Sequence, residues 1–196
     1  MVDTRDRIIV ATNELFRRHG YNGTTLTQIS EASAATIGSI YHFFPGGKEA
    51  LAVAVIEATG AVYRELFESI VAEADGPAAA YADFFNGAAA VLEESDFIDP
   101  CPIGTVAREV ANTSEPLREA AKRAFDSWID AAHAHLTSAG IASGVAGDLA
   151  IVFVATVEGT FILSRTQRST GPLIVAGRHL AALVDRATED VTSSRT

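Results

Sequence analysis

A short segment near the amino terminus carries side chains suited to contact DNA. Thr36, Gly38, Ser39, Tyr41 and His42 lie within seven consecutive residues. Hydroxyl and imidazole groups can bond phosphate oxygens and base edges, and a glycine lets a helix approach a base edge closely. The segment holds no carboxylate, whereas a solvated helix face usually carries Glu and Lys. This composition favours a DNA-recognition helix. The predicted DNA-binding residues are Thr25, Thr36, Ile37, Gly38, Ser39, Tyr41, His42 and Lys48.

Three short helices are predicted to position these residues. The first runs from Thr4 and stops at Gly20. Thr25 opens the second as an N-cap, with Gln28 completing a capping box. Thr36 offers the N-cap of the third, which ends before Pro45-Gly46-Gly47. The three residues between the second and third helices have the spacing of a helix-turn-helix, although on spacing alone an ordinary helical hairpin is the better explanation.

The rest of the chain is also predicted to be helical, from the 3.6-residue period of its apolar positions and its Gly and Pro stops. The expected fold class is all-α with about nine helices. Lys48 begins the fourth, and its charge beside that helix's amino terminus suits a phosphate contact. The remaining helices are predicted at 48–75, 77–94, 103–111, 115–138, about 145–168 and 173–190.

Composition narrows the class of protein. The 196 residues are 48% hydrophobic and 20% charged, which excludes a disordered tail. The net charge is −10, yet residues 1–50 hold five basic and five acidic residues, so the charge lies entirely in the remainder. A neutral head on an acidic body is compatible with the head alone meeting DNA. A single cysteine and the lack of an export signal pattern place the protein in a reducing cytoplasm.

Four runs of the sequence carry a family resemblance. The runs Thr24–Ala32 and Gly38–Leu51 closely resemble the DNA-binding head of TetR-family transcriptional repressors, and the runs Cys101–Ala107 and Ser114–Arg118 resemble the LmrA/YxaF-like branch. The resemblance implies a homodimer that reads a palindromic operator and releases it when the body binds an effector. It divides the chain into a helix-turn-helix DNA-binding domain, 1–47, and a linker helix with an effector-binding and dimerisation domain, 48–196.

The sequence departs from the family pattern at two positions. Ala34 stands in the turn where the family usually has glycine, although that backbone tends toward a left-handed conformation that alanine resists. Ile37 replaces a residue that is usually polar or basic, so its contact with DNA is expected to be apolar, as with a thymine methyl group. Both changes bear on operator sequence and affinity.

Apolar side chains of the body suggest a ligand site and an interface. Most of the large aromatic residues are expected to form core, and some to border an effector pocket between helices. The pocket candidates are Phe84, Phe85, Cys101, Ile103, Val106, Phe125, Trp128 and Phe153. The stretch 149–163 is apolar nearly all round, is shorter than a membrane span, and must be covered on both sides. A second subunit is expected to cover one side, where it packs against this stretch and the last predicted helix. The interface candidates are Ala155, Gly159 and Ile162 of the stretch and Leu180, Leu183 and Val184 of the last helix.

Other classes of function fit less well. His133 and His135 point to different faces of a predicted helix, and the sequence lacks paired cysteines, a P-loop and a nucleophile motif, so no metal site, catalytic residue or cofactor is expected. Cys101 is expected to be a small buried hydrophobe and not a redox sensor. The alternative function is a helical small-molecule carrier that does not bind DNA, and retardation of promoter DNA would distinguish the two.

Overall fold

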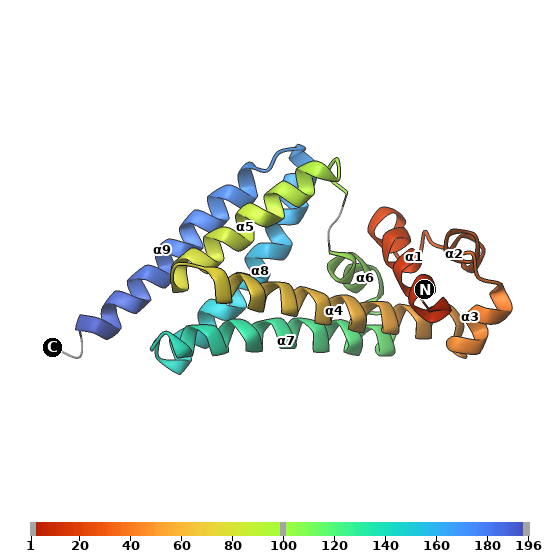
Figure 1. Cartoon of the computed structure of the whole chain (residues 1–196), viewed down its shortest axis with the longest axis horizontal. Coiled ribbons are helices and arrows are strands. Elements are labelled where there is room, and N and C mark those ends of the chain that lie inside the picture. Colours follow the sequence, from red (N-terminus) through yellow and green to blue (C-terminus); the bar gives the residue numbers. More distant parts are fainter. Residues whose placement is uncertain (1–2, 99–100, 194–196) are drawn as a thin grey trace. The chain divides into compact units, whose positions relative to one another are not determined.

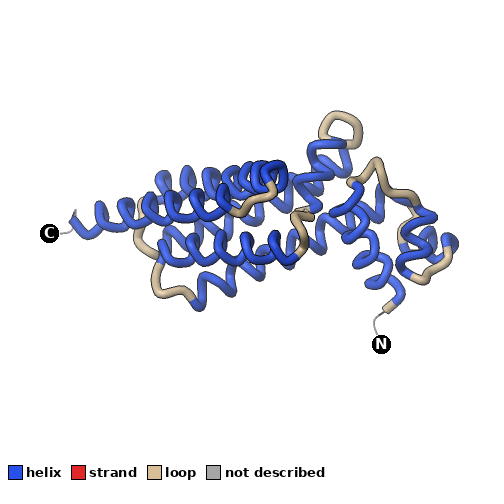
Figure 2. Tube along the Cα trace, turned by 90° about the horizontal axis from the view of Figure 1, so that it is seen from above, coloured by secondary structure: helices blue, strands red, loops and turns tan. Residues whose placement is uncertain are grey.

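A computed structural model describes residues 3–98 and 101–193. Over these residues the chain forms nine helices and no strands, as predicted (Figure 2). Asp99 and Pro100, part of the predicted loop before the sixth helix, lie outside the described residues. The contacts divide the chain into two compact units, which are described separately. Unit 1 comprises Met1–Ala61 and Cys101–Ala124, and unit 2 comprises Val62–Pro100 and Phe125–Thr196.

Unit 1 contains the predicted DNA-binding head, one complete later helix and parts of two others. Ile8, Phe16, Ile29, Ile40 and Leu51 are fully buried at its centre. A hydrogen bond of 3.1 Å from the Thr59 hydroxyl to Asn13 joins the fourth helix to the first. Unit 1 consists of α1 (Thr4–His19), α2 (Leu26–Ser33), α3 (Ile37–Phe43), the first part of α4 (Gly47–Glu73), α6 (Pro102–Val110) and the start of α7 (Glu115–Ser138).

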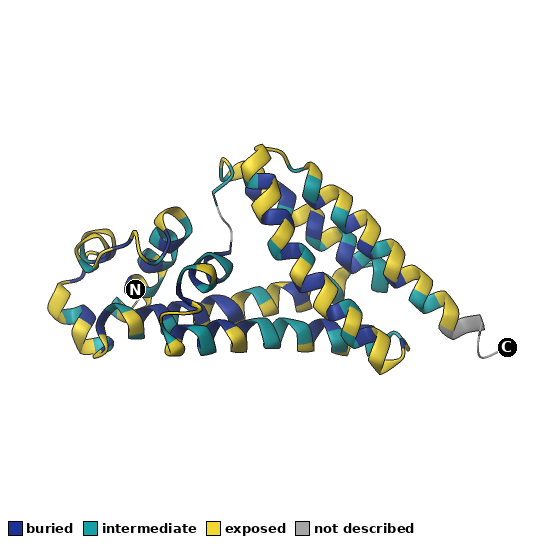
Figure 3. Cartoon of the chain, turned by 180° about the vertical axis from the view of Figure 1, so that it is seen from behind, coloured by how far each residue is buried: buried dark blue, intermediate teal, exposed yellow. Residues whose placement is uncertain are grey.

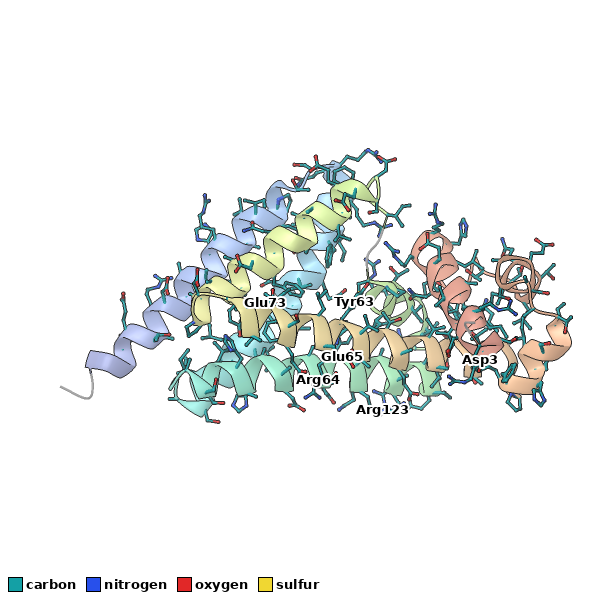
Figure 4. The ribbon with its side chains drawn as sticks, in the orientation of Figure 1. Asp3, Tyr63, Arg64, Glu65, Glu73 and Arg123 are labelled. Carbon is teal, nitrogen blue, oxygen red and sulfur yellow. The ribbon has the colours of Figure 1, made fainter. Side chains whose placement is uncertain are left out.

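Close packing of α4 and α7 completes unit 1. A Cβ on Gly60 of α4 would lie 2.9 Å from the Cβ of Ala124 on α7, so the glycine permits the two helices to approach. Arg123 of α7, labelled in Figure 4, pairs with Glu57 of α4 at 2.7 Å. The head therefore shares a compact unit with residues from much later in the chain. The predicted division at residue 47 stays a prediction.

Unit 2 is a helical bundle built around aromatic side chains. It contains the rest of α4 and α7 together with α5 (Pro77–Glu94), α8 (Ser143–Gln167) and α9 (Gly171–Ser193). Helices α5 and α9 lie side by side (Figure 1). At Gly177 of α9 a Cβ would lie only 2.6 Å from the Cβ of Phe85, so this close approach requires glycine.

Helix α8 is longer than the apolar stretch recognised in the sequence. Its 25 residues include a window with a mean hydropathy of 1.7, so by length and composition alone it would suffice to cross a membrane. Of that window, 39% is buried inside the chain. The other face is exposed, and Figure 3 shows exposed residues in yellow along the helices of this unit.

Candidate DNA-binding and ligand-binding sites

Helix α3 presents the predicted recognition residues on its surface. Ile37, Gly38, Tyr41 and His42 are exposed, while Ile40 is fully buried and fixes the helix to the head. The side chains of Ile37 and Tyr41 are among the large apolar groups that the head leaves exposed, at 43% and 50%. One face of α3 therefore anchors the helix, and the opposite face is available to a partner.

Local hydrogen bonds set the start of both short helices. Thr36 accepts a bond of 3.0 Å from the backbone N–H of Ser39, and their hydroxyls lie 2.9 Å apart. At α2, Thr25 accepts from the N–H of Gln28 at 3.3 Å, and the Gln28 side chain accepts from the N–H of Thr25 at 2.8 Å. The predicted caps are confirmed. Thr25 and Thr36 thus stabilise the first turns of their helices, in addition to any contact that they make with DNA.

The turn between α2 and α3 has the strained backbone expected from the sequence. Ala34 adopts a left-handed conformation with φ 51° and ψ 37°. A hydrogen bond of 2.6 Å from the Ser30 hydroxyl to the carbonyl of Ala35 holds the turn. Because alanine resists this region, the surrounding contacts must offset the strain.

Lys48 lies at the start of α4 against an aromatic ring. Its Nζ is 4.2 Å from the centre of the Tyr21 ring. Burial lowers the pKa of Lys48, and the nearby Glu109 carboxylate opposes this by favouring the charged amine. Close to the same helix start, a Cβ on Gly47 would lie 3.1 Å from the Tyr41 ring, and Gly47 has φ +65°. The glycine thus lets Tyr41 pack beside Lys48's helix.

Helix α6 contacts the head through a carboxylate that sequence analysis did not identify. Glu109 Oε2 accepts a bond of 2.7 Å from the backbone N–H of Asn22, in the turn between α1 and α2. Its other oxygen occupies the space beside Gly20, where an added Cβ would lie 1.9 Å away. At the start of α7, Ser114 donates to Glu49 at 2.7 Å. These bonds fix the later segments to the head within unit 1.

The predicted pocket residues fall into three groups. Phe84, Phe85 and Phe153 contact one another in unit 2, with ring centres 5.1 to 6.1 Å apart. Phe125 and Trp128 form a second contact in unit 2, at 5.3 Å. The third group, Cys101, Ile103 and Val106, is buried in unit 1.

Further aromatic side chains join the first of these groups. Phe67 of α4 contacts Phe84 at 6.1 Å and Phe153 at 5.2 Å. Tyr81 contacts Phe67 at 5.9 Å and Phe153 at 5.0 Å. We call Phe67, Tyr81, Phe84, Phe85, Phe153 and His135 the aromatic cluster. It draws on α4, α5, α7 and α8, so it connects four helices of unit 2.

The predicted interface residues lie in two environments. Ala155, Gly159, Ile162 and Leu183 are exposed. Leu180 and Val184 are buried in the core of unit 2, where they are 3% and 0% exposed. Other apolar residues of the same two helices are also exposed, and the sequence analysis did not include them in the interface. These are Ile151, Val152 and Leu163 on α8, and Ile174 and Val175 on α9.

The described residues contain no group of three or more His, Cys, Asp and Glu side chains that could hold a metal ion. His133 bonds the Ser143 backbone and hydroxyl at 3.2 and 3.1 Å, and His135 lies 3.4 Å from the carbonyl of Pro77. Both histidines thus contact groups of the fold. Cys101 is 4% exposed, which suits a packing role, and its redox behaviour stays untested.

Two family models match the segments that contain most of these residues. Residues 8–55 match the model of bacterial regulatory proteins of the tetR family, and residues 77–179 match the C-terminal domain of LmrA/YxaF-like transcriptional regulators. The chain belongs to the TetR family of transcriptional regulators. The first match contains α2, α3 and Lys48, and the second contains α5, α8, the start of α9 and every member of the aromatic cluster except Phe67.

Relatives along the whole chain support this assignment. The uncharacterized HTH-type transcriptional regulator YxaF of Bacillus subtilis is 34% identical over 93% of this chain and 95% of its own length. The HTH-type transcriptional regulator LmrA of the same organism is 33% identical over 88% of this chain and 92% of its own. The relatives are transcription regulators, and no enzyme family is indicated.

Solved structures show the same fold. A TetR transcriptional regulator from Legionella pneumophila superposes with a TM-score of 0.80 at 22% identity, covering 95% of this chain and 97% of that one. The regulator FadR from Bacillus subtilis, solved in complex with stearoyl-CoA, gives a TM-score of 0.69 at 16% identity and covers 91% and 96%. At these identities the likeness concerns the fold alone.

Two features of this TetR-family chain escaped sequence analysis for different reasons. Tyr81 was not among the predicted pocket residues, although the sequence held a signal for it. Tyr81, Phe84 and Phe85 lie at i, i+3 and i+4, so helical periodicity places Tyr81 on the same face as the two phenylalanines. Glu109 bonds a residue 87 positions away, and nothing in the sequence signals such a contact.

Proposed function

We infer that this TetR-family regulator is a repressor that binds a palindromic operator as a homodimer and is released by a small, largely apolar effector. The exposed face of α3 carries the proposal. It offers Gly38, Tyr41 and His42 to a partner and places no carboxylate there. Such a face suits base edges and phosphates, and it would be unusual for a helix that meets only water.

The DNA contact is proposed to centre on α3. Its exposed residues would enter the major groove, and Lys48 would contact a phosphate at its edge. Two copies related by a twofold axis would hold their α3 helices roughly 34–36 Å apart, one turn of B-DNA. The neutral charge of residues 1–50 supports this arrangement, because the acidic remainder of the chain would be repelled by the phosphates.

The homodimer is proposed to form through the exposed apolar face of α8 and α9. Ile151, Val152, Ile162 and Leu163 of α8 are between 43% and 55% exposed. Gly159 has no atom within 4 Å of where a Cβ would stand, so this part of α8 presents bare backbone to a partner. Several exposed apolar side chains on one helix suggest an interaction site, and a closed twofold pair is the usual arrangement.

The effector is proposed to bind within unit 2, at the aromatic cluster. The fold neighbour FadR, solved with stearoyl-CoA, gives one instance of this fold holding a ligand with an apolar chain. Effector binding would shift the equilibrium toward a dimer whose heads no longer match the operator. Helix α4 would carry this change along the chain, since it holds Phe67 of the aromatic cluster and begins beside Lys48 at the head.

Retardation of the DNA upstream of the protein's own gene tests the proposal. We expect a shifted complex whose affinity falls steeply with salt. Replacing Tyr41 with Phe should weaken the complex, while the affinity for any ligand that co-purifies stays unchanged. Equal loss of both affinities would contradict the proposed division between head and body. A protein that retards no nearby intergenic fragment would be a carrier instead.

A further inference from the structure

Tyr81 holds a hydroxyl group that the fold does not use. The side chain lies in the core of unit 2 and is 0% exposed. Its hydroxyl oxygen has no hydrogen-bond partner among the described residues. Burial raises the pKa of Tyr81, so the group stays protonated and remains a donor at neutral pH. A buried donor without an acceptor destabilises a fold, and native proteins retain few of them.

The surroundings of Tyr81 are aromatic. Phe153 and Phe67 pack at 5.0 and 5.9 Å, and the His135 ring lies at 5.9 Å. Burial lowers the pKa of His135, so its ring is neutral at pH 7. Its Nε2 already faces the carbonyl of Pro77 at 3.4 Å. The rings that contact Tyr81 therefore carry no net charge, and His135 has its own backbone contact.

Packing alone does not explain a tyrosine at this position. Phenylalanine fills the next positions on the same face of α5, at Phe84 and Phe85. A phenylalanine at 81 would keep the ring contacts and remove the unsatisfied donor. The hydroxyl is thus a cost to folding that a bound acceptor would offset.

We propose that the Tyr81 hydroxyl donates a hydrogen bond to an acceptor oxygen of the effector. The effector would be an uncharged, largely apolar molecule that packs among Phe67, Phe84 and Phe153. A charged ligand is disfavoured, because a buried ion needs a charged partner and the rings around Tyr81 supply none. The inference rests on the proposed function, and it adds which atom recognises the ligand and what the ligand must present.

A matched pair of probes isolates this hydrogen bond. Benzophenone and diphenylmethane have the same two rings, joined by a carbonyl group in the first and by a methylene group in the second. Titration of each into the full-length protein, followed by the fluorescence of Trp128, the chain's one tryptophan, gives both affinities. The ratio of the two affinities measures recognition of the carbonyl oxygen and cancels most of the effect of ring burial.

Tyr81→Phe is the test variant. We expect the ratio to fall about 3- to 10-fold, which corresponds to the loss of one neutral hydrogen bond. Without probe, the thermal midpoint of the variant should equal or exceed that of the wild type, because an unsatisfied donor is gone. This opposite movement of stability and recognition distinguishes a ligand-binding hydroxyl from one that merely supports the fold.

Tyr63→Phe is the control. Tyr63 of α4, labelled in Figure 4, belongs to unit 2 but contacts Trp128, at 5.9 Å. Its replacement should leave the affinity ratio unchanged. A ratio that falls in Tyr63→Phe and not in Tyr81→Phe would place the ligand beside Trp128 and overturn the proposal.

The remaining outcomes separate this proposal from the proposed function. Equal affinity ratios in the wild type and Tyr81→Phe would show that the Tyr81 hydroxyl does not bond the ligand. That result would refute the proposed hydrogen bond, even if benzophenone releases the operator. Failure of both probes to bind the wild type would also refute it. A ratio that depends on Tyr81 while benzophenone leaves DNA retardation unchanged would support the site and count against effector-driven release.

Discussion

The exposed faces of α3 and α8 differ in the chemistry that they offer. Helix α3 exposes Gly38, Tyr41 and His42 beside a single aliphatic side chain, Ile37, whereas α8 exposes several aliphatic side chains such as Ile151 and Ile162. Both faces lie opposite a buried side that anchors the helix. The polar face suits a phosphate-lined groove, and the apolar face suits a surface that excludes water. Exposure therefore indicates that a partner is possible, and side-chain type indicates which one.

The two helices are also held in different ways. Helix α3 depends on contacts between near neighbours, such as the bond from Ser39 to Thr36. The bundle around α8 depends on side chains distant in sequence, such as Tyr81 against Phe153. Substitutions in the head should therefore change DNA binding with modest changes in stability, while substitutions in the bundle should change stability or assembly.

The apolar face of α8 is expected to give the largest effect. Ile162→Glu places a carboxylate in the proposed dimer interface, so the protein should become monomeric and lose operator affinity by more than about 100-fold, because two heads no longer bind together. Sedimentation velocity measures the mass. Val91→Glu, at a similarly exposed apolar position on α5, should remain dimeric. A dimer that persists in Ile162→Glu would place the interface elsewhere.

Close packing in unit 2 is tested at Gly177. Gly177→Ala forces a Cβ against Phe85, so the free energy of unfolding should fall by about 1–3 kcal/mol. Gly87→Ala, on the facing helix α5, meets no atom within 4 Å and should be neutral or stabilising by up to about 1 kcal/mol. Urea unfolding measures both. Equal losses in the two variants would contradict the close contact with Phe85 as the cause of the effect at Gly177.

Lys48 tests the proposed phosphate contact of the head. Lys48→Ala should weaken operator binding by about 10-fold and reduce the slope of log affinity against log salt by about two, because the homodimer loses one phosphate contact in each subunit. Retardation at several salt concentrations provides the slope. Arg64→Ala removes a cation of α4 that pairs with Glu68 in unit 2, and it should leave the slope unchanged. An unchanged slope in Lys48→Ala would mean that the amine serves only its contact with Tyr21.

The strained turn of the head is expected to give the smallest effect. Ala34→Gly relieves a left-handed alanine, so stability should rise by about 0.5–1 kcal/mol. Ala32→Gly, an exposed position inside α2, should lower stability by about 1 kcal/mol. Thermal unfolding compares the two. If both variants lose stability, the turn is not strained in solution.

The sequence determined the helices and their ends, because these depend on residues a few positions apart. The N-caps of α2 and α3 were predicted from Thr25, Gln28 and Thr36, and glycine and proline residues indicated where helices end. The exposed side chains of α3 could be predicted as well, since a short helix with one buried position, Ile40, leaves few ways to orient the others. That these side chains contact DNA stays a prediction. The family resemblance reinforced both conclusions.

Only the tertiary structure decided which apolar residues are core and which are surface. Leu180 and Val184 read as interface residues but are buried, while Ile151 and Ile174 are exposed. On α8 the sequence could not make this distinction, because that helix is apolar on nearly all sides and has no polar face to orient it. On α9 periodicity places Leu173, Leu180 and Val184 on one face, and only the packing shows that this face meets the chain's own core. The Glu109 bond to Asn22 and the unsatisfied hydroxyl of Tyr81 likewise arise from the packing of distant segments, which local patterns do not encode.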